Sequence, residues 1–286
     1  MTLQYGVVGW PVEHSLSPAM HNAAFAELAI DAEYKLLPIA PEEAIFRMRQ
    51  LPSQGLSGWN VTVPHKAAAA QCVDDIDPQA RMVNSVNTVK VDPKSGRLFG
   101  CSTDGYGLEM AAKEHFGFSA PGGRLAFIGG GGAVCAAAVH MALRGAEKIV
   151  LLNRTVDKIE RIKTIIVGNA PSCRVICLSL KSDAPSIRRT LEDIPLVIQS
   201  TSLGLRPDDP LPVSSSLLPE ECRVMDMIYG DTPLLKALRK EGCECADGLS
   251  MLLHQGARSF TIWTGREAPV ETMRSALKKA LKDRSG

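Results

Sequence analysis

The chain has 286 residues, 45% of them hydrophobic, so it is long enough for about two globular domains. Its 32 lysines and arginines nearly balance 31 aspartates and glutamates, which argues against nucleic-acid or charged-membrane partners and favours a small-molecule partner. No apolar run approaches the roughly 18 to 20 residues of a membrane span, and we expect no signal peptide. The eight cysteines form no CxxC pair, so we expect reduced thiols in a cytoplasmic protein, without disulfides or a bound metal.

Strand and helix patterns alternate at the start of the chain. We expect strands at 3–8 and 33–39 and a helix at 42–51, the alternation of a parallel sheet covered on both faces. Between the two strands, Ser17 is expected to cap a helix whose first residue is Pro18. Capping alone would account for Ser17, whereas Ser15 places a second hydroxyl near the same amides, where it could help to hold a carboxylate.

The stretch from Gly58 to Lys66 reads as a third strand followed by a helix start. Val61 and Val63 alternate with polar residues, so this strand should have one apolar and one polar face. Lys66 would then lie near the positive end of the following helix, where a cation is disfavoured. That position makes Lys66 a candidate for proton transfer, although an exposed lysine of no chemical role remains the alternative.

Two further polar side chains accompany strand patterns. Asn87 lies within a predicted strand at 85–89, and Asp104 follows another at 98–102, beyond a hairpin turn at 92–96. Asp104 could serve as an ordinary turn cap, yet the carboxyl ends of strands in open sheets also carry ligand-binding groups. The acidic cluster at 74–77 favours a solvated loop over a metal site.

A glycine-rich turn lies between a predicted strand at 124–128 and a predicted helix at 134–144, with another strand at 149–152. This strand, turn, helix and strand form the βαβ unit that binds dinucleotides, with the pyrophosphate at the helix N-terminus. The third glycine of the usual spacing is replaced by Val134. The predicted phosphate-binding residues are Gly129, Gly130, Gly131, Gly132 and Ala133.

The end of the second strand of this unit favours NADP over NAD. It carries Asn153, Arg154 and Thr155 in place of the usual acidic residue, and Arg154 could pair with a 2′-phosphate. Lys158 could add a second cation or be a solvated helix residue. Strands are expected further on at 174–178, 196–200 and 224–228, and helices at 186–192, 234–241, 249–263 and 270–281. The polar turn with Thr201 and Ser202 falls at the expected cofactor edge.

In chain order, these segments resemble the shikimate dehydrogenase family over nearly the whole length. The matching segments are Ser-Leu-Ser-Pro at 15–18, Asn-Val-Thr-Val-Pro-His-Lys at 60–66, Asn-Thr at 87–88, Thr-Asp-Gly at 103–105, the glycine turn, Asn-Arg-Thr at 153–155 and Asp-Gly-Leu at 247–249. The resemblance implies reversible reduction of 3-dehydroshikimate to shikimate by NADPH, a step of chorismate and aromatic amino-acid biosynthesis.

The resemblance also implies a two-domain α/β fold with a cleft between the domains. Residues 1–104, completed by tail helices 247–286, would form an αβα substrate domain with a mostly parallel sheet, and residues 105–246 a Rossmann domain that binds NADP. The implied catalytic pair is Lys66 and Asp104. Ser15 and Ser17, with Tyr229, would hold the substrate carboxylate, and the ring hydroxyls would contact Asn60, Thr62, Asn87 and Gln255. The implied cofactor residues are those of the glycine turn, Asn153, Arg154, Thr155, Lys158, Thr201, Ser202 and Gly248.

Trp10 and Trp59 are bulky beside the substrate segments, and the turn reads Gly-Gly-Gly-Gly where the family more often has Gly-Ala-Gly-Gly. These departures leave two alternatives open: a quinate/shikimate dehydrogenase that also uses NAD, and a non-catalytic dehydrogenase-like regulator that only binds metabolite. Intact Lys66 and Asp104 argue against the regulator. A monomer and a homo-dimer are both compatible with the sequence.

Overall fold

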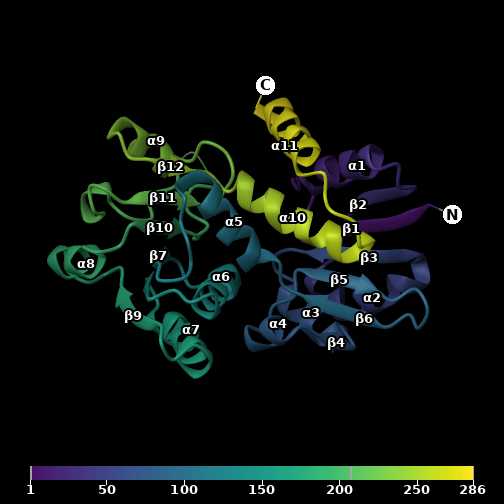
Figure 1. Cartoon of the computed structure of the whole chain (residues 1–286), viewed down its shortest axis with the longest axis horizontal. Helices are drawn as coiled ribbons and strands as arrows, with labels where there is room; N and C mark the ends of the chain where they lie inside the picture. Colours follow the sequence, from purple (N-terminus) through teal and green to yellow (C-terminus); the bar gives the residue numbers. More distant parts are fainter. Residues whose placement is uncertain (1, 207, 286) are drawn as a thin grey trace. The chain divides into compact units, whose positions relative to one another are not determined.

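A computed structural model describes residues 2–206 and 208–285. Residue contacts divide the chain into two compact units. The first unit runs to Gly107 and resumes at Leu252, and the second unit spans Leu108–Met251. The chain therefore passes from one unit to the other within α5 (Asp104–Phe116) and returns within α10 (Leu249–Thr264), as can be followed in Figure 1.

The first unit contains a six-stranded mixed sheet in the order β2-β1-β3-β5-β6-β4. β1 pairs in parallel with β2 and β3, and β4 with β6, whereas β5 is antiparallel to both β3 and β6. The hairpin turn predicted at 92–96 reverses the chain between β5 and β6, so the sheet is mostly rather than wholly parallel. The strands are β1 (Leu3–Gly9), β2 (Ala32–Pro38), β3 (Leu56–Val61), β4 (Asp75–Ile76), β5 (Thr88–Val91) and β6 (Leu98–Cys101).

Two predictions for this unit, a helix and a loop, need correction. The helix expected at 42–51 is a 3₁₀ turn, Pro41–Glu43, followed by α2 (Ala44–Gln50). The acidic cluster is partly ordered, because Asp75 opens β4 and Asp77 accepts the backbone N–H groups of Gln79 and Ala80 at the start of a short helix. The remaining helical segments are α1 (Ser17–Glu27), a 3₁₀ turn at Pro52–Gln54, α3 (Lys66–Cys72), α4 (Pro78–Met82) and α11 (Val270–Ser285).

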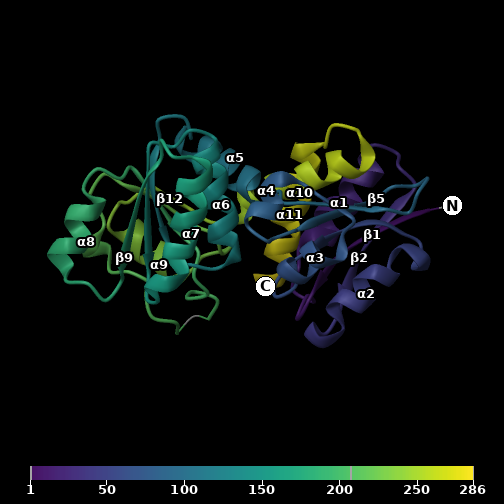
Figure 2. The same cartoon turned by 90° about the horizontal axis from the view of Figure 1, so that it is seen from below.

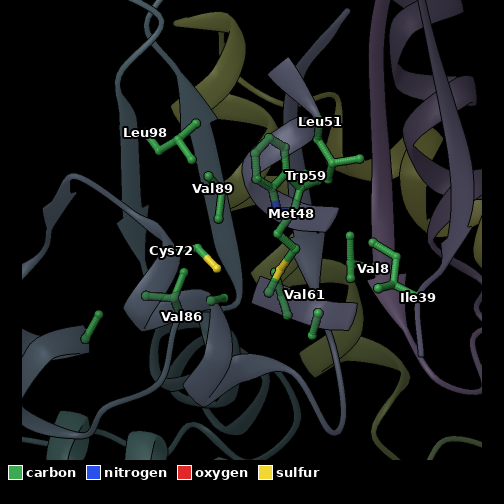
Figure 3. Close-up of a cluster of buried hydrophobic side chains, with 13 residues drawn as sticks. Val8, Ile39, Met48, Leu51, Trp59, Val61, Cys72, Val86, Val89 and Leu98 are labelled. Atoms are coloured by element: carbon green, nitrogen blue, oxygen red, sulfur yellow. The ribbon is translucent and has the colours of Figure 1, made fainter. Parts of the chain in front are cut away.

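The two faces of this sheet are covered by different helices (Figure 2). Figure 3 shows the core on one face, where Trp59 and Val61 of β3 pack with Met48 of α2 and Cys72 of α3. On the other face, Tyr5 of β1 stacks on Phe25 of α1 and Trp263 of α10. Because side chains alternate along a strand, Asn60 points away from the core that holds Trp59 and Val61.

The second unit contains six parallel strands in the order β12-β11-β10-β7-β8-β9. The order reverses between β7 and β10, which is the topology of the Rossmann fold and confirms the prediction. The strands are β7 (Arg124–Ile128), β8 (Lys148–Asn153), β9 (Arg174–Ser179), β10 (Leu196–Gln199), β11 (Arg223–Asp226) and β12 (Cys245–Ala246). The helical segments are α6 (Gly132–Leu143), α7 (Val156–Asn169), α8 (Ala184–Leu191), a 3₁₀ turn at Ser215–Leu217 and α9 (Pro233–Lys240). No helix among the described residues is long and apolar enough to cross a bilayer.

Candidate active site

Lys66 and Asp104 form an ion pair in the first unit. Lys66 Nζ lies 2.6 Å from Asp104 Oδ2, and the two side chains are 21% and 7% exposed. Lys66 is the first residue of α3, as expected, but Asp104 begins α5 rather than ending a strand. The start of a helix favours a carboxylate and disfavours an ammonium, so the contact with Asp104 offsets the unfavourable position of Lys66.

Asn87 holds the other oxygen of this carboxylate. Its Nδ2 donates to Asp104 Oδ1 at 2.8 Å and lies within 3.3 Å of Gln255 Oε1. Its Oδ1 accepts the backbone N–H of Thr103 at 2.8 Å and the hydroxyl of Thr88 at 2.9 Å. With β5 beginning at Thr88, Asn87 precedes the strand rather than lying inside it, and from there its amide reaches both Asp104 and α10.

Asn60 joins the same hydrogen-bond network from β3. Its Nδ2 lies within hydrogen-bond distance of the backbone oxygen of Asn87, the Thr88 hydroxyl and the Ser259 hydroxyl, at 3.0 to 3.1 Å. Ser259 and Gln255 both come from α10, one turn apart, so the tail helix closes this network. Thr88, Thr103 and Ser259 were not predicted as site residues, although the first two belong to the matching Asn-Thr and Thr-Asp-Gly segments.

Tyr34 of β2 is a further residue that sequence reasoning missed. Its hydroxyl donates to Asn60 Oδ1 at 2.8 Å. Burial raises the pKa of Tyr34 well above its ordinary value, and the nearby Ser17 side chain opposes this with a smaller effect. A tyrosine in a strand pattern carries no sequence feature that separates this role from ordinary core packing.

The Ser15 to Pro18 segment corrects the predicted cap. The helix begins at Ser17 itself, and the Ser15 hydroxyl accepts the backbone N–H of Ser17 at 3.3 Å. Leu16 therefore takes the N-cap position, without a side-chain cap, and the Ser15 hydroxyl satisfies one backbone N–H of this helix start. Arg284 of α11 donates to the carbonyl oxygens of His14 and Ser15, which ties this loop to the C-terminal helix.

The turn between β3 and α3 is anchored at both sides. The Thr62 backbone N–H donates to Val8 O at 2.8 Å, and the buried His65 ring donates through Nε2 to Ile39 O at 2.7 Å. β3 ends at Val61, so Val63 leaves the predicted apolar face and is 71% exposed. These contacts hold the turn that leads into Lys66.

The two tryptophans occupy different environments. Trp59 is fully buried in the core opposite Asn60 (Figure 3), so it does not lie beside the substrate residues as the sequence suggested. Trp10 is 49% exposed, and its backbone N–H donates to Val63 O at 3.2 Å. Of the two tryptophans, Trp10 therefore stays a candidate for an influence on ligand choice, and Trp59 does not.

The glycine turn of the second unit has the features of a phosphate cradle. It links β7 to α6 at the position where the strand order reverses, which is where Rossmann folds bind nucleotides. A Cβ on Gly130 would lie 3.0 Å from Asn153 Nδ2, whereas one on Gly131 or Gly132 would meet nothing within 4 Å. No side chain caps the start of α6 within the described part of the chain, so its first N–H groups suit an anion.

The residues predicted to bind the 2′-phosphate follow β8. Arg154, Thr155 and Lys158 are exposed, and Asn153 is half-buried, with its Nδ2 donating to Thr155 O at 2.9 Å. The Lys158 Cβ would lie 3.2 Å from a Cβ on Gly130, so the cationic segment adjoins the glycine turn. Two cations beside a helix N-terminus fit a phosphorylated dinucleotide.

The other predicted residues of this unit lie at the carboxyl ends of β10, β11 and β12. Thr201 is half-buried and its hydroxyl accepts the Leu203 N–H, while Ser202 is exposed. Tyr229 is half-buried in the turn after β11. Gly248 is packed against the same turn, since a Cβ there would lie 2.2 Å from Met227 O. This packing gives Gly248 a structural reason to be glycine, and its contact with cofactor stays a prediction.

A Rossmann unit with a glycine cradle defines a dinucleotide-binding protein, and the partly buried Lys66–Asp104 pair is its candidate catalytic site. Residues 7–89 match the model of the shikimate dehydrogenase substrate binding domain, and residues 248–278 match that of the shikimate 5′-dehydrogenase C-terminal domain. The NADP(+) shikimate dehydrogenase of Methanopyrus kandleri is 38% identical over 281 residues, covering 97% of this chain and 95% of that protein. The chain belongs to the shikimate dehydrogenase family.

Solved structures agree with this assignment. A shikimate dehydrogenase in complex with NADP+ superposes with a TM-score of 0.87 at 33% identity, over 97% of this chain and 95% of the other. The Listeria monocytogenes shikimate 5-dehydrogenase, in complex with shikimate and NAD, gives 0.87 at 32% identity, with 96% of each chain covered. The Corynebacterium glutamicum quinate dehydrogenase, in complex with NAD, gives 0.85 at 25% identity, over 97% and 99%.

Proposed function

We propose that this protein is an NADP-dependent shikimate dehydrogenase, which interconverts 3-dehydroshikimate and shikimate in chorismate and aromatic amino-acid biosynthesis. The observation that carries the proposal is the Lys66–Asp104 contact of 2.6 Å, held by Asn87 inside a chain of this family. A metabolite-binding regulator would have no use for a partly buried ion pair of this kind. The 38% identity to an NADP(+) shikimate dehydrogenase supports the choice of substrate and cofactor.

We assign residues 1–104 and 247–286 to binding of the substrate and residues 105–246 to binding of NADP. Ser15 and Ser17 would hold the substrate carboxylate together with Tyr229, and Asn60, Thr62, Asn87 and Gln255 would contact the ring hydroxyls. The side-chain N–H groups of Asn60 and Asn87 already donate to acceptors within the protein. Each must therefore exchange or share one of these bonds when substrate binds, which makes recognition depend on the neighbours that orient them.

Lys66 is suited to handle the proton at the reacting oxygen. An ammonium group has three N–H donors, of which Asp104 takes one, so two can turn toward substrate. In the direction of reduction, Lys66 would stabilise the negative charge that develops on the carbonyl oxygen and donate a proton to it. Asp104, fixed by Asn87 on its far oxygen, would orient the ammonium and accept a hydrogen bond from the substrate hydroxyl.

The bound dinucleotide supplies hydride exchange at the carbon that carries this oxygen. The residues that would hold it are those of the glycine turn, Asn153, Arg154, Thr155, Lys158, Thr201, Ser202 and Gly248. Arg154 and Lys158 would pair with the 2′-phosphate, which is the feature that separates NADP from NAD. We expect a cytoplasmic enzyme with small-molecule ligands, as a monomer or a homo-dimer.

A quinate/shikimate dehydrogenase that also accepts NAD is the second candidate. It is favoured by the quinate dehydrogenase among the structural neighbours, and by the NAD in the Listeria complex. The exposed side chain of Trp10 is the feature of this chain that would change the range of substrates accepted. Exposed Arg154 and Lys158 weigh toward NADP.

The deciding experiment follows nicotinamide absorbance while shikimate or quinate is offered with NADP or NAD. The proposal expects the highest kcat/KM for shikimate with NADP. A higher kcat/KM with quinate or with NAD would contradict the substrate or cofactor assignment and support the second candidate. Folded protein that is silent in all four assays would contradict enzymatic function on these substrates.

The role of Lys66 is tested separately. The Lys66→Ala variant should lower kcat by roughly a thousandfold while KM for shikimate changes little, because the ammonium acts mainly in the transition state. A control is Lys90→Ala, because Lys90 donates to Ile262 O at 2.8 Å and takes no part in the network around Asp104. Near-normal turnover of Lys66→Ala would remove this residue from the chemistry.

A further inference from the structure

Tyr34 links two residues that are proposed to bind opposite ends of the substrate. Its hydroxyl donates to Asn60 Oδ1 at 2.8 Å, and its backbone is held by Asn22 of α1, the helix that begins at Ser17. Ser17 belongs to the carboxylate end of the proposed site and Asn60 to the hydroxyl end. Tyr34 itself is 2% exposed, so it acts from beneath these residues rather than on substrate.

The backbone carbonyl oxygen of Asn87 determines which atom donates in the hydrogen bond between Tyr34 and Asn60. Since a carbonyl can only accept, the amide of Asn60 must turn its Nδ2 toward it, at 3.1 Å. Oδ1 of Asn60 then faces Tyr34, which must give its only proton to that oxygen. The hydroxyl of Tyr34 therefore sets the orientation of the Asn60 amide.

Two residues of α1 fix the position of the tyrosine ring and therefore of its hydroxyl. His21 of α1 stacks on the ring with centroids 4.4 Å apart and planes inclined by 10°. Asn22, the next residue, pairs with both backbone groups of Tyr34: its Nδ2 donates to Tyr34 O at 3.0 Å and its Oδ1 accepts from Tyr34 N at 2.8 Å. The helix that begins with Ser17 thus fixes the tyrosine that orients Asn60.

We infer that Tyr34 is a positioning residue of the substrate site, which sets the spacing between the carboxylate-binding Ser17 and the hydroxyl-binding Asn60. The inference rests on the proposed function. Among the described residues, the Tyr34 hydroxyl has no hydrogen bond to Lys66, Asp104 or Asn87, so it governs substrate affinity and leaves the proton-transfer pair in place. This spacing selects ligands that carry a carboxylate and a ring hydroxyl at a fixed separation.

The test is the Tyr34→Phe variant, which removes the hydroxyl and keeps the ring stacked on His21. We expect KM for shikimate to rise about tenfold, because a buried acceptor on Asn60 loses its donor, while kcat and KM for NADP change less than about threefold. The matched control is Tyr5→Phe, since Tyr5 is the register partner of Tyr34 on β1 and is equally buried. Tyr5→Phe should leave all three constants within about twofold of wild type.

A general loss of structure would move kcat and both KM values together, so the split between them distinguishes positioning from stability. The Asn60→Ala background supplies a second test: Tyr34→Phe should raise KM less there than in wild type, because the two residues act through one contact. An unchanged KM for Tyr34→Phe, a fall in kcat alone, or full additivity with Asn60→Ala would each overturn the inference.

Failure of the proposed function has a different outcome. If the wild type does not oxidise shikimate, calorimetric titration of shikimate into wild type and Tyr34→Phe still decides the inference. A Kd about tenfold weaker for the variant supports it, and equal Kd values overturn it. A wild type that binds no shikimate overturns both statements.

Discussion

His21 makes the stability of the first unit depend on pH. The ring is fully buried, and neither nitrogen has a hydrogen-bond partner among the described residues. Burial lowers the pKa of His21 from 6.5 to about 3, because the imidazolium cannot be solvated there. The stabilisation from its neutral state is complete above pH 6.5 and is lost as the pH falls toward 3, where the unfolded chain binds a proton that the native chain does not.

The size of the effect follows from this shift. Each pH unit below the ordinary pKa costs about 1.4 kcal/mol, so lowering the pH to about 4.5 should remove roughly 3 kcal/mol of stability through His21 alone. The His21→Leu variant cannot titrate and should lack this part of the slope. Phe25→Leu, on the same helix, is the packing control, because it removes buried ring atoms without removing a titratable group.

Urea unfolding at several pH values between about 7 and 4.5 measures this directly. The free energy of unfolding of wild type and of Phe25→Leu should fall in parallel with decreasing pH, while that of His21→Leu falls less steeply. A constant difference between wild type and His21→Leu over this range would refute the argument that burial depresses the pKa of His21.

Two predictions concern the second unit. Arg154→Ala should raise KM for NADP by about 10- to 100-fold and leave KM for NAD nearly unchanged, since only the contact with the 2′-phosphate is lost. Equal effects on both cofactors in initial-rate assays would show that Arg154 does not bind this phosphate. Gly248→Ala should lower the free energy of unfolding by more than about 2 kcal/mol, because its Cβ would lie 2.2 Å from Met227 O. Gly168→Ala in α7, where a Cβ meets nothing within 4 Å, is the control and should be neutral or stabilising by up to about 1 kcal/mol; equal thermal shifts for the two would contradict the packing argument.

The Rossmann unit was largely predictable because its information is local. The strand at 124–128 is found with the predicted bounds, and the helix after the glycine turn begins two residues earlier than expected. Continuous apolar runs mark the buried parallel strands, and glycines mark the turn, so neighbouring residues suffice to recognise each element. Where the fold was misjudged, at Asp104 and in the acidic cluster, short polar side chains suited a turn and a helix start equally well.

By itself, the sequence determined the family, the βαβ unit and the residue types of the candidate site, since these depend on short motifs and on periodicity. Only the tertiary structure decided that Lys66, Asn87, Asp104 and Gln255 share one hydrogen-bond network, because they lie on separate elements far apart along the chain. It also decided the role of Tyr34 and removed Trp59 from the candidate site. A strand pattern does not show which role a buried tyrosine or tryptophan has. The side of the sheet on which its side chain lies, and the residues it contacts there, are set by strand order and packing rather than by its neighbours in sequence.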